Sequence, residues 1–477
     1  MIGKLTKIIA TIGPATEAPE KIEELIHSGV NVIRFNFKHS DLEWHRERIE
    51  RVKNVAKKLN ASVATLLDLQ GPEIRLSLPF DKIDLEIGER ILVSKALGIK
   101  EKGISFTPPD IISSLKDGQR VSADDGLFEF VVRIENDKTY LESLSSGTLL
   151  NKKTINIANL DFDFPVIHNG DRMGLKLAKD LEVDFIALSF VRNANDIKTL
   201  KDEMKKINLN SKIIAKIETP KAISDIDNII NASDAIMIAR GDLGVELSLE
   251  EVPFFQKQII RNCIQKGIPV ITATQMLESM TQRPIPTRAE VSDVANAVYD
   301  FTDAVMLSGE TANGKYPIAA VSIMGKVVSY SENKNRVSDI RNVFSYELLD
   351  VSQMVCDSAF NLYKVLKIRK ETVKGFLVFT ESGKTARMLA RYRPHVPIFA
   401  FCPKEDLVRK LSLSFGVSPI FQKSLDEKSE ITKADIQKAL EKLKDIGLCK
   451  TGDNFIVLHG DHWTSKAGTS TIRIATA

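Results

Sequence analysis

Short apolar runs rich in β-branched residues alternate with longer segments of helical spacing in the first part of the chain. Strands are predicted at Thr6–Ile12, Asn31–Phe37 and Ser62–Leu69. The segments between them, Pro19–Ser28 and Leu42–Leu59, carry apolar residues at the spacing of amphipathic helices. Strands of near-continuous apolar character, each followed by a helix, are typical of a parallel sheet that is buried on both faces.

This rhythm stops between residues 73 and 164, where short alternating runs separated by turn residues predict a small module made of strands. It resumes at Asp171, and five more strands, each followed by a helix-like segment, are predicted at Phe185–Phe190, Lys212–Glu218, Ala235–Arg240, Pro269–Thr274 and Ala304–Gly309. With the three earlier strands this makes eight, which favours a closed (β/α)₈ barrel. An open doubly wound sheet has the same periodicity and stays an alternative at this point.

The charged stretch Glu332–Arg341 has few apolar residues and predicts a linker to a third segment. Beyond it, strands interleaved with helices are predicted at Val373–Thr380, Ile398–Cys402, Pro419–Gln422, Phe455–His459 and Thr471–Ala475. This pattern indicates a separate α/β domain with an open sheet.

Composition narrows the class of protein. The chain has 477 residues and a formal net charge of +3, which is too close to neutral to favour nucleic acid as a partner. The four cysteines are scattered singly, so neither a zinc site nor a redox dithiol is predicted. No apolar run reaches the roughly 18 residues that span a bilayer, and no signal peptide precedes the first strand. We therefore expect a cytoplasmic protein without a membrane partner.

Charged and polar side chains follow the ends of several predicted barrel strands, and in a (β/α)₈ enzyme these ends meet at one face. The segments are Arg34–His39, Asp68–Arg75, Lys216–Glu218, Arg240–Asp242, Thr274–Gln275 and Ser308–Glu310. Salt bridges among barrel loops would explain any one of these residues. Charges of both signs after so many strands are better explained by a functional site.

The residue types suggest which chemistry this site supports. Glu218 and Asp242 are carboxylates on adjacent strands, suited to a hard divalent ion such as Mg²⁺. Backbone amides from Gly241 onward, at the start of a helix, would suit a carboxylate. Three cations supply the fixed positive charge that phosphate groups require: Arg34, Arg75 and Lys216. A metal and cations around an anion pocket indicate phosphoryl transfer.

Seven stretches, in this order along the chain, resemble motifs of the pyruvate kinase family. They are Lys7–Ala15, Asp68 with Gly71–Arg75, Ile214–Glu218, Ala239–Gly244, Ala273–Met280, Pro286–Glu290 and Leu307–Ala312. The resemblance implies transfer of the phosphoryl group of phosphoenolpyruvate to ADP, giving pyruvate and ATP in glycolysis. It also implies the fold class: an α/β protein with a TIM barrel (1–72 and 165–335), an inserted small β-barrel lid (73–164) and a C-terminal open-sheet α/β regulatory domain (343–477).

The resemblance assigns roles residue by residue. Lys216 would stabilise charge on the transferring phosphoryl group, Arg34 would contact that group, and Glu218 and Asp242 would hold Mg²⁺ or Mn²⁺. Substrate would be bound by Arg34, Arg75, Gly241, Asp242 and Thr274. The network that protonates the enolate would comprise Thr274, Ser308 and Glu310. The nucleotide would lie near Asn36, His39 and Arg75.

Two residues have weaker assignments. Asp124 in the lid would reach the active site on closure. Trp44 would lie near the nucleotide base, and a packed helix aromatic is the alternative.

Departures from the family pattern affect the monovalent cation. Typical members read R-x-N-F-S-H-G, with the serine helping to ligate an activating K⁺, and this chain has Lys38 at that position. The L-D-T-K-G motif is also changed, to Leu67–Gly71, and loses the threonine that serves the ion. We hypothesise that the ammonium of Lys38 replaces K⁺, with Asn36, Asp68 and Glu73 as partners, so that K⁺ is not required. The alternative is that Lys38 points to solvent and the enzyme is slow or insensitive to K⁺.

The lid contains a further departure. The family's S-K-K-G-V-N-L-P-G is replaced by N-K-K-T-I-N-I-A-N at Asn151–Asn159. We therefore expect lid closure to differ from that of typical members.

In the C-terminal segment, five residues between a strand and a helix resemble the family's loop for sugar-phosphate effectors: Thr380, Ser382, Gly383, Lys384 and Thr385. Gly468–Arg473 resembles the second loop of that pocket. A sugar phosphate or nucleotide is the expected effector, and a well-capped helix without ligand is the alternative. The family implies a homotetramer.

Two other functions are compatible with parts of the pattern. One is a lyase or mutase acting on phosphoenolpyruvate or pyruvate, and the other is a sensor of phosphorylated metabolites that has lost catalysis. The presence of Lys216, Glu218, Asp242 and Thr274 argues against the sensor.

Overall fold

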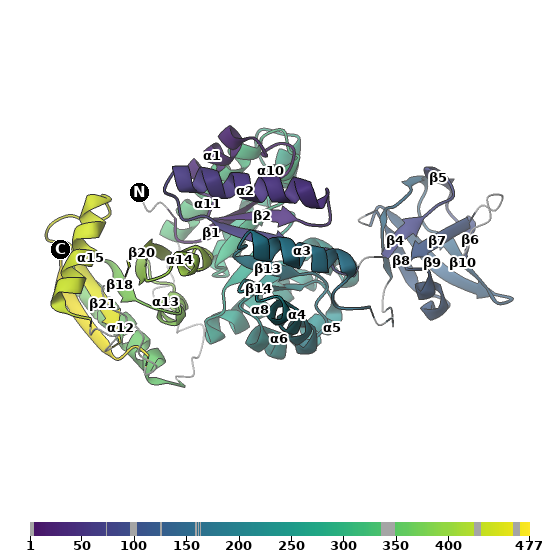
Figure 1. The fold of residues 1–477 in the computed structure, drawn as a ribbon. Helices are drawn as coiled ribbons and strands as arrows, with labels where there is room; N and C mark the ends of the chain where they lie inside the picture. The colour runs from purple at the N-terminus through teal and green to yellow at the C-terminus, as the bar shows by residue number, and fades with distance from the viewer. Residues whose placement is uncertain are drawn as a thin grey trace.

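The computed structural model describes residues 4–72, 74–95, 103–124, 126–157, 160, 162, 164–334, 349–423, 431–460 and 468–477. Figure 1 shows three bodies in a row. The barrel lies in the middle, the inserted domain extends from one end of it, and the C-terminal domain lies at the other end.

Eight parallel strands close into the central barrel in the order β1-β17-β16-β15-β14-β13-β3-β2, with β1 pairing both β17 and β2. Their bounds are β1 (Lys7–Thr11), β2 (Val32–Asn36), β3 (Ala64–Asp68), β13 (Phe185–Leu188), β14 (Lys212–Ile217), β15 (Ala235–Ala239), β16 (Val270–Ala273) and β17 (Ala304–Leu307). Closure excludes the open doubly wound sheet, and the predicted barrel is confirmed.

Successive residues of each strand point alternately into the barrel and toward the surrounding helices, which explains why the strand sequences are almost entirely apolar. Ile9 on β1 points into the barrel, where it packs with residues such as Met237 and Met306. Its neighbours Ile8 and Ala10 point outward and pack against the surrounding helices. The interior is therefore a filled core, and chemistry is left to the strand ends and loops.

The helices around the barrel follow the predicted segments, and some of them begin at a side-chain cap. They are α1 (Pro19–His27), α2 (Leu42–Lys58), α3 (Asn169–Asp180), α4 (Ala194–Lys206), α5 (Pro220–Ser224), α6 (Ile226–Ala232), α7 (Arg240–Glu246), α8 (Val252–Lys266), α9 (Arg288–Tyr299), α10 (Gly309–Ala312) and α11 (Pro317–Lys334), with the 3₁₀ turn η2 (Glu278–Thr281). Thr287 and Glu290 form a capping box at α9, and Asp41 caps α2.

The inserted domain is a second closed barrel, with strand order β10-β6-β7-β4-β12-β8-β9, and a two-stranded sheet β11-β5 lies beside it. Its elements are β4 (Ile74–Ser77), β5 (Lys82–Leu85), β6 (Arg90–Val93), β7 (Gly103–Thr107), η1 (Pro109–Ser114), β8 (Arg120–Ala123), β9 (Phe128–Glu135), β10 (Lys138–Ser143), β11 (Gly147–Leu150) and β12 (Thr154–Ile157). The domain is connected to the main barrel after β3 and before α3, so its position depends on these two connections (Figure 1).

The C-terminal domain is a five-stranded open sheet in the order β20-β19-β18-β21-β22, in which the edge strand β22 is antiparallel to β21. The elements are α12 (Val351–Ile368), β18 (Val373–Phe379), α13 (Lys384–Ala390), β19 (Ile398–Cys402), α14 (Glu405–Leu411), β20 (Val417–Phe421), α15 (Lys433–Asp445), β21 (Asn454–His459) and β22 (Thr471–Thr476). The predicted open sheet is confirmed.

The linker predicted from Glu332 begins too early, because α11 continues to Lys334. The Glu332 carboxylate accepts the backbone N–H groups of Leu5 and Thr6 and so holds the start of β1. These bonds require an ordered helix end. The rest of the predicted linker, to Arg341, lies outside the described residues.

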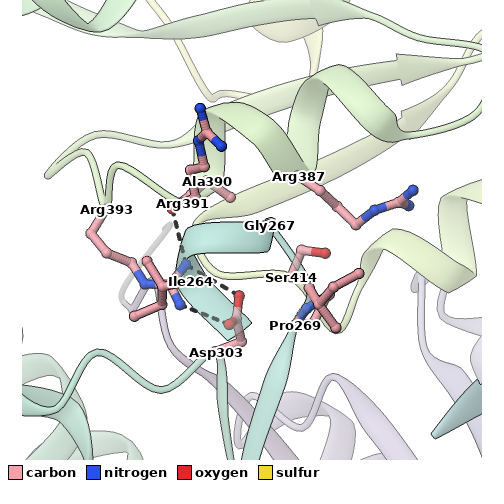
Figure 2. A pocket seen from close by; sticks show the side chains of 10 residues that line it. Ile264, Gly267, Pro269, Asp303, Arg387, Ala390, Arg391, Arg393 and Ser414 are labelled. Carbon is pink, nitrogen blue, oxygen red and sulfur yellow. Dashed lines mark hydrogen bonds and ion pairs between the residues drawn. The ribbon is translucent and has the colours of Figure 1, made fainter. Parts of the chain in front are cut away.

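The C-terminal domain packs on the end of the barrel where the strands begin. Asp303, just before β17, pairs with Arg393 at 2.7 Å, and Lys7 Nζ donates to the carbonyl of Val417 at 2.7 Å. Figure 2 shows this contact beside a small cavity of about 10 Å³ that residues of both domains line. The carboxyl ends of the strands, and the inserted domain, are therefore on the far side from the C-terminal domain.

Candidate active site

Lys216, near the end of β14, is the centre of the buried polar cluster at the carboxyl end of the barrel. Its Nζ lies 2.9 Å from Glu218 Oε1 and 3.4 Å from Asp68 Oδ1. Burial by itself lowers the pKa of Lys216, but the carboxylates of Asp68, Glu218 and Asp242 outweigh burial and raise this pKa above its ordinary value. The site therefore keeps a fixed positive charge at this point.

Arg34 and Asp68 form a second buried pair next to Lys216. The guanidinium of Arg34, in the middle of β2, donates to Asp68 Oδ2 through Nε at 2.8 Å and lies 2.6 Å from it through Nη2. Its Nη1 donates to Thr11 Oγ1 at 3.0 Å. Burial would raise the pKa of Asp68, yet Lys216 and Arg34 hold this pKa below its ordinary value, so Asp68 stays ionised. One carboxylate thus orients both cations.

Ser189 and Phe190, directly after β13, complete this cluster, and the sequence did not single them out. Ser189 Oγ accepts a hydrogen bond from Lys216 Nζ at 2.9 Å and donates to the carbonyl of Leu69 at 2.9 Å. The backbone N–H of Phe190, which has a φ of 53°, donates to Glu218 Oε2 at 2.5 Å. The sequence feature that could have identified these two residues is their position at the end of a predicted barrel strand.

Gly241 and Thr274 meet across the ends of β15 and β16. The N–H of Gly241 donates to Thr274 Oγ1 at 2.8 Å, and Thr274 has a φ of 69°, in the left-handed region. Arg240 holds this conformation because its guanidinium donates to the carbonyl of Thr274 and pairs with Asp293, both at 2.7 Å. Such strain in a non-glycine residue needs this support from its surroundings.

Ser308 and Glu310 lie together after β17. Both carboxylate oxygens of the buried Glu310 accept backbone N–H groups, from Ser308 at 2.7 Å and from Leu277 at 3.1 Å. Glu310 therefore joins the loop after β17 to the loop after β16, which also carries Thr274. The two hydrogen bonds of Glu310 thus fix these two loops relative to each other.

A cleft of about 1100 Å³ separates the inserted domain from the barrel. From the barrel it is lined by Gly241, Asp242 and Gln275, and from the inserted domain by residues including Arg120, Ser122 and Asn156. The carboxylate of Asp242, in the first turn of α7, therefore faces open space next to the buried cluster.

The remaining predicted residues lie at the junction of barrel and inserted domain. Arg75, on β4, donates to the carbonyl of Lys152 at 3.2 Å within the inserted domain. The Lys38 N–H donates to Asn36 Oδ1 at 3.3 Å, and Lys38 Nζ reaches Thr154 Oγ1 at 3.3 Å. His39 is exposed next to Lys38. Of the proposed partners of Lys38, Asp68 is engaged by Arg34 and Lys216, and Glu73 lies outside the described residues.

Comparison with known proteins gives matches over nearly the whole chain. The family model "Pyruvate kinase, barrel domain" matches residues 3–321, and "Pyruvate kinase, alpha/beta domain" matches residues 354–475. This chain belongs to the pyruvate kinase family. It is therefore an enzyme, a kinase of the phosphotransferase class, and the family and function predicted from the motifs are confirmed.

Individual relatives agree with this family assignment. The chain is 40% identical to a pyruvate kinase of Bacillus licheniformis over 98% of its own length and 79% of the relative's. It is 41% identical to a pyruvate kinase of Staphylococcus aureus over 95% of its own length and 77% of the relative's. A crystal structure of a pyruvate kinase from Cryptosporidium parvum, 33% identical, superposes with a TM-score of 0.90 and covers 99% of this chain and 96% of that one.

The pyruvate kinase fold places the suggested effector loops together in the C-terminal domain. Thr385 and Thr469 hydroxyls lie 2.5 Å apart, and the Thr469 N–H donates to Ser352 Oγ at 2.9 Å. Gly383, with a φ of 77°, donates its N–H to Thr380 Oγ1 at 2.9 Å, and Lys384 pairs with Asp350 at 2.6 Å. The two loops are thus joined through their own hydroxyl groups.

Trp44 and Asp124, the two residues with weaker assignments, lie in separate surroundings. Trp44 packs on the barrel core and carries the guanidinium of Arg48 5.0 Å from its ring centre, as expected of a packed helix aromatic. Asp124 accepts a hydrogen bond from Lys153 Nζ at 2.7 Å within the inserted domain. Among the described helices, none has both the length and the apolar character that crossing a bilayer requires.

Proposed function

We propose that the cluster around Lys216 catalyses transfer of the phosphoryl group of phosphoenolpyruvate to ADP, which gives pyruvate and ATP. The observation that carries this proposal is the position of Lys216 between the carboxylates of Asp68 and Glu218. The charge of Asp242, which lines the cleft, also acts on it. The bond between phosphorus and the enol oxygen breaks, and a bond to the terminal phosphate oxygen of ADP forms. The remaining enolate takes up a proton at its methylene carbon.

Each residue of the cluster has a task in this reaction. Lys216 and Arg34 stabilise the negative charge that spreads over the transferring phosphoryl oxygens. Asp68 keeps both cations oriented and limits their repulsion. Thr274, in the strained loop that Glu310 and Arg240 support, lies where the enolate would be protonated, and Ser308 belongs to the same network.

The carboxylates of Glu218 and Asp242 fit a divalent cation. Glu218 Oε1 is buried and, within the described part of the chain, has no hydrogen bond of good geometry, although Lys216 Nζ is near. Burial raises the pKa of Glu218 above its ordinary value, which marks a carboxylate that lacks sufficient positive charge around it. Mg²⁺, or Mn²⁺, bound here would bring substrate oxygens together and neutralise their charge.

Among the described residues, no group of three or more His, Cys, Asp or Glu side chains gathers around one point. Two carboxylates would therefore leave most of the coordination shell to water and substrate, as is usual for Mg²⁺ in kinases. Chelation by EDTA should abolish turnover, and added Mg²⁺ should restore it. Glu218→Gln and Asp242→Asn should each raise the Mg²⁺ concentration needed for half-maximal rate at least tenfold, and unchanged metal dependence in both variants would contradict the assignment.

Lys38 supplies the positive charge that K⁺ provides in typical family members. Lys38 is half-buried two residues after β2, and its Nζ donates to Thr154 Oγ1 of the lid at 3.3 Å. Initial rates with K⁺ replaced by tetramethylammonium should stay near the rate in K⁺. Strong stimulation by K⁺ would overturn this role of Lys38.

The substrates bind in the cleft, with Arg75 and Asp124 of the lid closing over them and the nucleotide near Asn36 and His39. The family's homotetramer also suits this chain. Exposed apolar residues lie on α12 (Val365, Ile368), on the edge strand β22 (Ile474) and near α8 (Leu249, Phe254). Light scattering coupled to size exclusion measures the number of subunits.

A phosphate-bearing effector would bind between the 380–385 loop and the loop that contains Thr469. The exposed side chains there include Ser382 and Lys384. A thermal shift on adding sugar phosphates or nucleotides, lost in Lys384→Met, tests this site.

A further inference from the structure

Lys38 connects the barrel to the lid directly. It follows β2 of the barrel, where its backbone N–H donates to Asn36 Oδ1 at 3.3 Å. Its side-chain Nζ donates to Thr154 Oγ1, also at 3.3 Å, and Thr154 begins β12 of the lid. The two residues are 116 positions apart in sequence. A single side chain therefore connects two domains that line opposite sides of the cleft.

The face of the lid that carries Thr154 is also the face that lines the cleft. Thr154 on β12 is directly opposite Arg75 on β4 in an antiparallel pair. Side chains opposite each other in such a pair point to the same face of the sheet. Asn156, two residues further and thus on this same face, lines the cleft. The hydroxyl that binds Lys38 and the guanidinium of Arg75 are consequently held on one rigid surface.

Neighbouring strands fix Thr154 itself. Its carbonyl accepts the N–H of Asp124 at 3.1 Å, and the next residue, Ile155, pairs with both Ile74 and Ala123. The hydroxyl is therefore presented by the lid sheet and moves only with the lid. Whether the Lys38 ammonium can donate to this hydroxyl therefore depends on the position of the whole lid domain.

Both members of this contact are departures from the family pattern. Lys38 stands where that pattern has serine, and Thr154 stands at the glycine of S-K-K-G-V-N-L-P-G. Glycine has no hydroxyl to accept the bond, and serine is too short to reach the lid. The contact exists because the two side chains occur together.

We propose that Thr154 is a positioning residue for the Lys38 ammonium, and that the pair couples the position of the lid to the positive charge at the monovalent-cation site. This inference rests on the proposed role of Lys38. In the lid position that the structure describes, with the cleft between lid and barrel open, Thr154 holds the ammonium in place. When the lid swings away, the ammonium loses one of its ligands and the charge is less well oriented.

Steady-state kinetics of substitutions at both positions test the coupling. Thr154→Val removes the hydroxyl with little change in volume and should raise KM for ADP about threefold to tenfold, with a smaller change in kcat, as expected for one hydrogen bond to a charged donor. Thr154→Ser keeps the hydroxyl and should behave as wild type. Thr148→Val is the matched control, because the Thr148 hydroxyl donates to Asp84 within the two-stranded sheet β11-β5 of the lid. It should leave the kinetics unchanged.

A double-mutant cycle with Lys38→Met then isolates the contact. In the Lys38→Met background, Thr154→Val should change KM by less than about 1.5-fold, since its partner is gone. If Lys38→Met folds poorly, Lys38→Arg is measured in its place. This substitution keeps the charge and the reach of the side chain, so kinetics in its background should stay sensitive to Thr154→Val. Wild-type kinetics in Thr154→Val, or effects of the two substitutions that simply multiply, would overturn the coupling.

The outcomes separate this inference from the function on which it rests. Strong K⁺ stimulation of the wild type overturns the role of Lys38 as the replacement for K⁺, and with it the coupling to that charge. A wild type that needs no K⁺, together with a Thr154→Val variant that behaves as wild type, leaves the role of Lys38 intact and overturns the coupling alone.

Discussion

Replacing Asp303 by asparagine should strongly destabilise the junction between the barrel and the C-terminal domain. Asp303 Oδ2 accepts the N–H of Val270 at 3.1 Å and lies 2.7 Å from Arg393 Nη2. Oδ1 accepts the N–H of Phe415 at 2.9 Å and a bond from Arg393 Nη1 at 3.3 Å. The two side chains are only 4% and 5% exposed, so water cannot replace a lost partner (Figure 2).

The size of the effect follows from this geometry. Each oxygen already accepts from two donors, so the amide group of asparagine must face an N–H group whichever way it turns. The guanidinium of Arg393 also stays charged and buried without its counter-ion. Breaking a buried pair in this way costs about 3–5 kcal/mol. The exposed pair of Lys266 and Asp227 is the matched control, and Asp227→Asn should cost less than about 1 kcal/mol.

Urea unfolding followed by circular dichroism measures both variants. The double variant Asp303→Asn with Arg393→Met should be more stable than the sum of the two single effects predicts, because no unpaired charge remains. A free energy of unfolding for Asp303→Asn within about 1 kcal/mol of wild type would refute the reasoning.

Three further predictions concern charge, loop position and the catalytic lysine. Burial lowers the pKa of Lys7 from 10.5 to about 8, although Glu332 and Asp303 act in the opposite direction. Because the folded value lies below the unfolded one, the unfolded chain binds more protons between these two pH values, and stability should rise with pH through that window by at most about 3 kcal/mol. Urea titrations at several pH values check this, and the rise should be smaller in Lys7→Met. Glu310→Gln turns an amide toward one of two backbone N–H groups, so kcat should fall about tenfold or more in a coupled assay, whereas Glu43→Gln on the exposed side of α2 should change nothing. Ser189→Ala removes an acceptor of Lys216 and should lower kcat/KM by about tenfold, and it should cost about 1–3 kcal/mol of stability because the carbonyl of Leu69 also loses its donor. Wild-type activity in this variant would show that Lys216 needs no help from Ser189.

The barrel strands were predictable because burial on both faces imposes an apolar run on each. The residues Lys216 and Glu218 were predictable for the same reason, since charges at the end of such a run need an explanation. Closure of the barrel could not be predicted from the periodicity of single strands. It is shown by the pairing of the first strand, β1, with the last, β17. Strands of four residues in the lid, such as β8 and β12, are too short to show alternation reliably.

The contacts that escaped prediction join residues far apart in the chain. Ser189 resembles an ordinary residue after a strand, and only the fold places it 2.9 Å from Lys216. The carboxylate of Glu332 looked like part of a charged linker, yet it binds the N–H groups before β1. Likewise, Lys38 was noticed for its departure from a motif, whereas its partner Thr154 became visible through the packing of the lid on the barrel.

The central claim is that the cluster around Lys216 transfers a phosphoryl group from phosphoenolpyruvate to ADP. The most direct test measures ATP and pyruvate formed from these two substrates with Mg²⁺, in the wild type and in Lys216→Met. We expect equimolar ATP and pyruvate from the wild type and a loss of at least about 10²-fold in Lys216→Met, because the buried positive charge is gone. Binding of phosphoenolpyruvate without ATP formation, or its consumption without ADP, would contradict the account.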